Sequence, residues 1–91
     1  MPNVLIVDDN RNYRQAFTRN LLLEGYEVFE AEDSDEALEY LERETTDVVV
    51  TDLAMRHPTE GLDLIRQARS LKPHLPIIMI SAVGTFEEGA E

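Results

Sequence analysis

Three short, unbroken runs of mostly β-branched residues constrain the fold of this chain more than any other feature. They are VLIV at residues 4–7, VVV at residues 48–50 and IIMI at residues 77–80. Such runs are typical of strands that are covered on both faces, as in the middle of a parallel sheet. A further run, EVFEA at residues 27–31, carries charge at two of its five positions and therefore fits a strand nearer an edge.

The segments between these runs have the spacing of amphipathic helices. Asp9 or Asn10 can cap the first helix, and Gly25 fits a left-handed stop after it. Asp33, with Glu36 three residues later, has the arrangement of a capping box at the start of the second helix. The apolar positions that fall near one face of the first helix are Tyr13, Ala16, Phe17 and Leu21.

A third helix is predicted after Gly61, and Pro73 is predicted to end it. Its apolar residues, at helical spacing, are Leu62, Ile65 and Ala68. The start of a fourth helix is expected around residues 85–91. Strands that alternate with helices through right-handed crossovers predict an α/β fold, with a parallel sheet covered by helices on both faces. Its functional cleft is expected beyond the carboxyl ends of the strands, where the strand order reverses.

Acidic side chains gather where the predicted strands end. Asp8 and Asp9 follow the first strand, Asp52 ends the third, and Ser81 follows the fourth. If the first and third strands are neighbours, the three carboxylates share one cleft. Two unit charges about 4 Å apart repel by roughly 4 kcal/mol at an effective dielectric near 20, so such a trio requires a cation or a raised pKa. All-oxygen ligands, in a chain without Cys, favour a hard ion such as Mg²⁺.

An acidic site that holds Mg²⁺ suits phosphoryl chemistry. A carboxylate whose charge is offset by the ion can attack phosphorus in line and form an acyl phosphate. Asp52 is the predicted nucleophile because it stands alone on a central strand, opposite the Asp8 and Asp9 pair. Ser81 is predicted to donate a hydrogen bond to the new phosphoryl group.

In combination, these motifs resemble the receiver domain of bacterial two-component response regulators. The matching pieces, in order along residues 4–82, are VLIVDDN, DVVVTDLAM, EGLDLI and PIIMISA. The resemblance implies a flavodoxin-like doubly wound parallel sheet with strand order 2-1-3-4. It also implies that residues 1–91 form one receiver domain, which acts as a phosphoryl-accepting switch and not as a turnover enzyme.

The resemblance implies a role for each candidate residue. Asp52 would be the phospho-acceptor, which takes a phosphoryl group from a sensor histidine kinase or a phosphotransfer protein. Asp8, Asp9 and Asp52 would bind Mg²⁺, and the backbone carbonyl of Ala54 would be the remaining protein ligand. Ser81 would be the switch hydroxyl, which moves toward the phosphoryl group and shifts the face around the fourth helix.

Two departures from the family pattern keep a second function open. The loop after Asp52 holds one more residue before Gly61 than is usual. Receivers also usually continue into a fifth strand with an essential Lys and a fifth helix, whereas this chain stops at Glu91. Its only lysine, Lys72, precedes the fourth strand and cannot replace the missing one. The domain is therefore expected to be incomplete at its C-terminus.

The alternative function is a non-phosphorylated interaction or dimerisation module. Without a fifth strand, residues 77–80 would form an apolar edge, so we expect a homodimer through this strand or by exchange of elements. A phosphohydrolase of the haloacid dehalogenase type is a third reading. Its nucleophile lies in a DxD motif, however, and Asp52 is followed by Leu53 and Ala54.

Charge and hydropathy exclude several partners. The formal net charge of −11 repels phosphate backbones and anionic membranes, so we expect no direct contact with nucleic acid. The chain has no apolar run of about 18 residues, which a membrane-spanning helix would need. We therefore expect a cytoplasmic protein.

Overall fold

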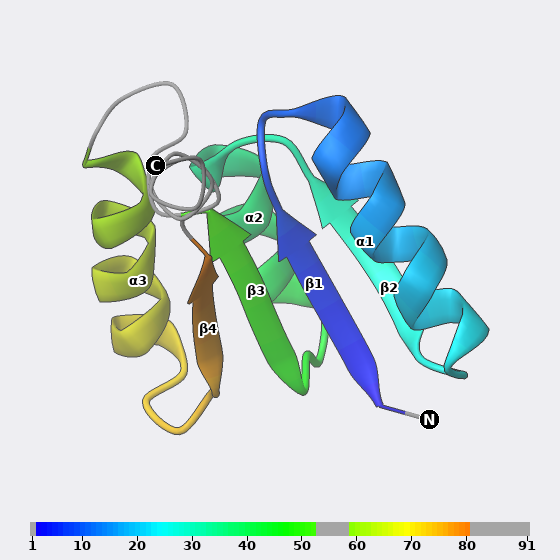
Figure 1. Cartoon of the computed structure of the whole chain (residues 1–91). Coiled ribbons are helices and arrows are strands. Elements are labelled where there is room, and N and C mark those ends of the chain that lie inside the picture. Colours follow the sequence, from blue (N-terminus) through cyan, green and yellow to red (C-terminus); the bar gives the residue numbers. More distant parts are fainter. Residues whose placement is uncertain (1, 53–58, 81–91) are drawn as a thin grey trace.

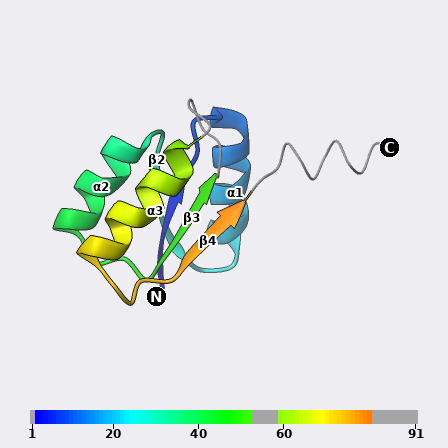
Figure 2. The same ribbon diagram turned by 90° about the vertical axis from the view of Figure 1, so that its left-hand side faces the viewer.

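The computed structural model describes residues 2–52 and 59–80, which form three layers. A four-stranded parallel sheet lies in the middle, with α1 on one face and with α2 and α3 on the other (Figure 1, Figure 2). The elements, in chain order, are β1 (Asn3–Val7), α1 (Arg11–Leu23), β2 (Glu27–Ala31), α2 (Ser34–Arg43), β3 (Val48–Asp52), α3 (Glu60–Leu71) and β4 (Ile77–Ile80). The predicted α/β architecture is confirmed. The expected start of a fourth helix lies outside the described residues.

The strands are arranged in the order β2-β1-β3-β4, and every neighbouring pair is parallel. The register places Val7 beside Ala31 of β2 on one side and beside Thr51 of β3 on the other. The flavodoxin-like doubly wound order 2-1-3-4 is therefore confirmed, as is the edge position of the mixed run at residues 27–31. The order reverses between β1 and β3, and in open sheets this is where ligands bind.

Two apolar clusters hold the helices on the sheet. The larger cluster lies between the sheet and the pair of helices α2 and α3, and it includes Leu5 and Leu41, both 0% exposed. The smaller cluster lies on the α1 face and includes Val4 and Ile6. Alternate residues of β1 thus enter different clusters, as expected of a strand that is covered on both faces.

The ends of the first two helices follow their predicted caps. The Asn10 side chain accepts a hydrogen bond from the Tyr13 amide at 3.1 Å, so Asn10, and not Asp9, caps α1. Gly25 follows α1 with φ 95°, a left-handed conformation that favours glycine. Asp33 caps α2, because its carboxylate accepts from the Glu36 amide at 2.8 Å.

The third helix differs from its prediction in its start and in its buried face. α3 begins at Glu60, so Gly61 lies inside the helix and does not precede it. The buried residues of α3 are Gly61, Leu64 and Ala68, whereas Leu62 is 43% exposed. Both faces have helical spacing, and a glycine has no apolar side chain to mark the face that packs closest. The buried face was therefore predicted only in part: Ala68 is confirmed, whereas Leu62 is not.

The apolar stripe of α1 is largely exposed. Tyr13 and Phe17 are 54% and 40% exposed, and no residue of α1 is buried. Figure 1 shows α1 alongside β1 and β2, and among the described residues no helix covers the same face of β3 and β4. Ile78 of β4, which pairs with Val50, is 53% exposed there. The described part of the molecule thus presents apolar side chains on this face.

Polar contacts join the chain at the amino edge of the sheet. The Asn3 amide donates to the Asp47 carboxylate at 2.7 Å, and the Asn3 side chain donates to the Thr45 carbonyl at 3.0 Å.

Lys72 caps the C-terminus of α3 and precedes the amino end of β4, so it lies away from the carboxyl ends of the strands. Of the helices in residues 2–52 and 59–80, none has the length and hydrophobicity to span a bilayer.

Candidate metal centre

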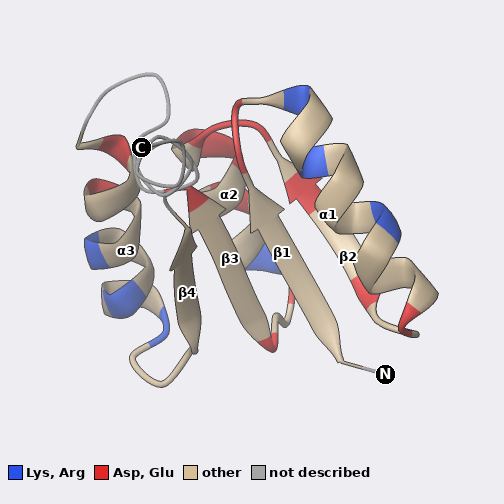
Figure 3. Cartoon of the chain, in the orientation of Figure 1, with Lys and Arg blue, Asp and Glu red and all other residues tan. Residues whose placement is uncertain are grey.

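Three carboxylates lie together at the carboxyl edge of the sheet. Asp8 and Asp9 directly follow β1, and Asp52 is the last residue of β3, which pairs with β1. Because the two strands are parallel, their ends meet, and one oxygen from each carboxylate lies within 4.8 Å of the others. Figure 3 shows acidic residues at the ends of β1 and β3. The structure therefore brings together the three acids from which the sequence predicts a metal site.

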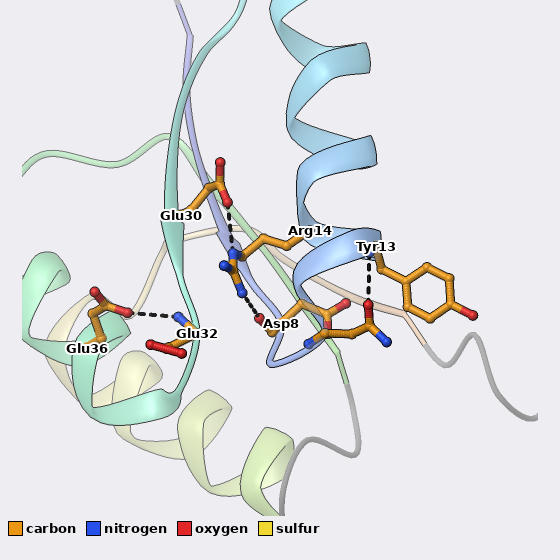
Figure 4. Close-up of polar contacts among 7 residues, drawn as sticks. Asp8, Tyr13, Arg14, Glu30, Glu32 and Glu36 are labelled. Atoms are coloured by element: carbon orange, nitrogen blue, oxygen red, sulfur yellow. Dashed lines mark hydrogen bonds and ion pairs between the residues drawn. The ribbon is translucent and has the colours of Figure 1, made fainter.

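Asp8 is held in place through both its backbone and its side chain. Its amide donates to the Ala31 carbonyl of β2 at 3.1 Å. Its carbonyl accepts from the Arg14 guanidinium of α1 at 2.8 Å, as Figure 4 shows. Its Oδ1 accepts from the Asn10 amide at 2.9 Å. Contacts from three segments therefore fix the direction of this carboxylate.

The surroundings of Asp8 raise the cost of ionising its carboxyl group. Burial is the main cause that raises the pKa of Asp8 above its ordinary value, and the nearby charges of Asp52 and Asp9 raise it further. The Asn10 N–H and the Arg14 charge act in the opposite direction. A bound cation would favour the ionised form of all three carboxylates.

The donor set fits a hard divalent cation. All three side chains offer carboxylate oxygens, in a cluster compact enough for one ion. Mg²⁺ is usually bound by one or two carboxylates, with its other positions left to water and phosphate oxygens. The other two predicted site residues, Ala54 and Ser81, lie outside the described residues. Ile80 pairs in register with Asp52, so the residue that precedes Ser81 lies beside the predicted phospho-acceptor.

Two residues beside the acids were not predicted from the sequence. Arg14 Nε lies 2.8 Å from Glu30 Oε1, while the same guanidinium reaches the Asp8 carbonyl. The only sequence signal is that Arg14 lies one helical turn after the cap residue Asn10. Glu30 is on β2 and has no motif that connects it with the acids.

Replacement of Asp8 is expected to stabilise the metal-free protein at neutral pH. A raised pKa means that the folded state binds the Asp8 proton more tightly than the unfolded state. The free energy of unfolding therefore falls as the pH rises from the ordinary value of 3.8 through the raised one. Asp8→Asn removes this loss, and its gain at pH 7 is below about 1 kcal/mol, since solvent screens a partly exposed charge. Thermal unfolding in the presence of a chelator measures the difference.

Mg²⁺ should reverse this order of stability. The ion stabilises the wild type because it binds the folded state, whereas Asp8→Asn loses most of that effect. Glu42→Gln, which removes an exposed carboxylate from α2, is the matched control and should respond to Mg²⁺ as the wild type does. An Asp8→Asn protein that melts below the wild type without metal would contradict the expectation.

Comparisons with known proteins agree with this geometry. The family model of the response regulator receiver domain matches residues 4–91. Response regulator MprA of Mycolicibacterium vanbaalenii is 38% identical over 85 residues, which cover 93% of this chain and 36% of that protein. Response regulator protein FleR of Pseudomonas aeruginosa is 34% identical over 88 residues, which cover 97% of this chain and 18% of that protein. The chain thus spans about a third or less of the length of these relatives.

Solved structures show the same fold. Response regulator protein TrrA from Thermotoga maritima, in complex with Mg²⁺-BeF, matches with a TM-score of 0.85 and 32% identity, over 97% of this chain and 76% of that one. The complex of histidine kinase ThkA with TrrA matches with a TM-score of 0.82 and 34% identity, over 90% of this chain and 70% of that one. The match along residues 4–91, the strand order and the likeness to these structures show that the chain belongs to the response regulator receiver domain family.

Proposed function

We propose that this chain is the phospho-accepting receiver module of a two-component response regulator. Asp52 takes the phosphoryl group from a sensor histidine kinase or a phosphotransfer protein. The observation that carries the proposal is the group of three carboxylates within 4.8 Å at the ends of β1 and β3. The Mg²⁺-BeF complex of TrrA and the complex of TrrA with ThkA support the same cofactor and the same class of partner here.

In the transfer, an Asp52 carboxylate oxygen forms a bond to phosphorus while the bond from phosphorus to the donor's imidazole nitrogen breaks. The imidazole leaves with the electron pair of that bond. Bound Mg²⁺ would offset the negative charge of the acids and of the phosphoryl oxygens. Asp8, Asp9 and Asp52 would hold the ion through carboxylate oxygens, and the Ala54 carbonyl is the proposed remaining protein ligand.

The phosphorylated module acts as a switch and not as a turnover enzyme. Ser81 is the proposed switch hydroxyl, because it directly follows the residue that pairs with Asp52. A hydrogen bond from Ser81 to the phosphoryl group would favour one of two arrangements of the segment after β4. We place this switch in the cytoplasm, and the net charge of −11 disfavours direct contact between this domain and nucleic acid.

The test is Mg²⁺-dependent uptake of one phosphoryl group. The 91-residue chain is incubated with a low-molecular-weight acyl phosphate, with Mg²⁺ or with a chelator, and its intact mass is measured. One added phosphoryl group is expected with Mg²⁺ and none with the chelator. A wild-type chain that stays unmodified in both conditions would overturn the proposed function.

A second candidate function is a non-phosphorylated dimerisation module. Ile78 and Met79 are both 53% exposed on β4, which pairs on one side only among the described residues. Exposed apolar side chains on an edge strand favour pairing with another chain. A homodimer through β4, or through exchange of elements, would cover them.

Light scattering tests this second candidate. The dimerisation module predicts a dimer mass that is unchanged in Asp52→Asn and that Ile78→Lys converts to a monomer mass. Leu62→Lys, a matched change of an exposed leucine on α3, should leave the dimer intact. A wild-type chain that is monomeric at every concentration measured rules this function out.

A further inference from the structure

Arg14 connects three elements beside the acid cluster, although it offers no ligand to a metal ion. It projects from α1, its Nε donates to Glu30 of β2 at 2.8 Å, and its NH1 donates to the Asp8 carbonyl at the end of β1 at 2.8 Å. Figure 4 shows both contacts as they leave one guanidinium. The Arg14 side chain is only 15% exposed, so this arrangement is not a loose surface pair.

The acceptor directly after β1, the Asp8 carbonyl, is the decisive part of this geometry. The Asp8 carbonyl belongs to the peptide that joins Asp8 to Asp9, so a bond to it restrains the backbone on which both carboxylates stand. The other bonds at this turn hold Asp8 alone: its amide bonds to β2, and its Oδ1 bonds to Asn10. Of the hydrogen bonds described here, only the one from Arg14 acts on the peptide between the two acids.

The charge of Arg14 is of the wrong sign for a residue that attracts a cation. A guanidinium close to the acids lowers the pKa of Asp8, and it also repels a divalent ion that enters the same cluster. Glu30, 34% exposed, offsets part of that charge and orients the guanidinium. A favourable effect of Arg14 on metal binding would therefore have to come from geometry and not from its field.

We propose that Arg14 is a positioning residue for the metal centre: anchored by Glu30, it fixes the Asp8–Asp9 peptide and so aims both carboxylates toward Asp52. This inference rests on the proposed function, because it concerns the same Mg²⁺ site. The planar guanidinium of Arg14 bonds two acceptors at once, which the ammonium group of a lysine on its flexible stem reproduces poorly. Residues that orient metal ligands in this way typically change metal affinity by about 10- to 100-fold when they are replaced.

The direction in which one substitution changes the Mg²⁺ affinity separates a positioning role of Arg14 from the effect of its charge. Mg²⁺ is titrated into the 91-residue chain, and the dissociation constant is taken from amide chemical shifts. Arg14→Gln removes a positive charge, so the field alone would make Mg²⁺ bind more tightly. Positioning predicts the opposite, a dissociation constant raised about tenfold. Arg14→Lys keeps the charge and should also bind more weakly than the wild type.

The matched control is Arg43→Gln. Arg43 also pairs with a glutamate, Glu39 at 2.9 Å, but this pair lies in the last turns of α2 and is 68% and 67% exposed. The control changes the net charge equally and should leave the dissociation constant unchanged. If Arg14→Gln, with a cooperative thermal transition, binds Mg²⁺ as tightly as the wild type or more tightly, the inference is overturned. Wild-type affinity in Arg14→Lys would overturn the role of the planar fork.

A metal-free measurement keeps this inference separable from the proposed function. The Asn10 amide proton bonds to the Asp8 carboxylate, so its chemical shift reports the direction of that side chain. Arg14→Gln should move it upfield in the presence of a chelator, whereas Arg43→Gln should not. A wild-type chain that binds no Mg²⁺ would refute the proposed function, and the Asn10 amide would still decide the geometric part. An unmoved Asn10 signal in Arg14→Gln would refute the positioning role.

Discussion

Asp52→Asn is expected to abolish Mg²⁺-dependent phosphoryl uptake by the chain. An amide oxygen is a poor nucleophile and cannot form the acyl phosphate, and the substitution also removes one of the three carboxylates from the cluster. The loss should be complete by intact mass, with no singly phosphorylated species at any incubation time. Thermal stability should not fall, because the change removes one negative charge from a crowded acidic site.

The control for this prediction is Asp47→Asn. Asp47 directly precedes β3, the strand that Asp52 ends, and its carboxylate accepts from the Asn3 amide at 2.7 Å. Asparagine can accept the same hydrogen bond with its side-chain oxygen. Phosphoryl uptake by Asp47→Asn should match that of the wild type. Uptake that persists in Asp52→Asn would place the acceptor elsewhere and refute the assignment of Asp52.

Leu5→Ala is expected to cost about 2–5 kcal/mol of the free energy of unfolding. Leu5 lies in the middle of β1, between β2 and β3, and its side chain is 0% exposed within the larger apolar cluster. Truncation leaves a cavity where both neighbouring strands prevent collapse. Domains of this size have about 5–15 kcal/mol of total stability, so the variant loses a large share of it. Urea unfolding, followed by circular dichroism, measures the change.

Leu23→Ala is the matched control for Leu5→Ala. The same atoms are removed from a side chain that is 79% exposed at the end of α1. Its free energy of unfolding should change by less than about 0.5 kcal/mol. Similar losses in the two variants would mean that burial in the larger cluster does not determine the cost.

Most of the fold could be predicted from the sequence because local signals agree with the tertiary arrangement. The runs at residues 4–7 and 48–50 became neighbouring central strands, and the charged run at residues 27–31 became an edge strand. Asn10, Asp33 and Gly25 mark helix ends in the structure as they do in the sequence. These signals concern residues within one turn or one strand, where short-range physics determines the conformation.

Predictions failed where burial depends on which neighbours are present. The alternative faces of α3 have comparable spacing, and the buried one includes Gly61, which a count of apolar residues overlooks. The composition of IIMI fits a covered strand, and only the expected lack of a fifth-strand neighbour predicted the apolar edge, on which Ile78 and Met79 are 53% exposed in β4. The apolar stripe of α1 likewise indicates an amphipathic helix but not how much of it is covered.

The acids of the candidate site were visible in the sequence, whereas their support was not. Asp8, Asp9 and Asp52 stand at strand ends, so the parallel topology alone brings them to one edge. The contact between Arg14 and Glu30 depends on the rotation of α1 and on the register of β2 against β1. Neither quantity follows from a pattern of residue types.

Because all four strands are parallel, the carboxylates and the contacts at the amino ends of the strands lie at opposite edges of the sheet. At the amino edge, hydrogen bonds join Asn3 to Asp47 and to Thr45, a full strand length from the carboxylates. Substitutions at the amino edge can therefore change thermal stability while the carboxylates at the other edge keep their arrangement. Related receiver domains can therefore differ in thermal stability and keep the same acidic site.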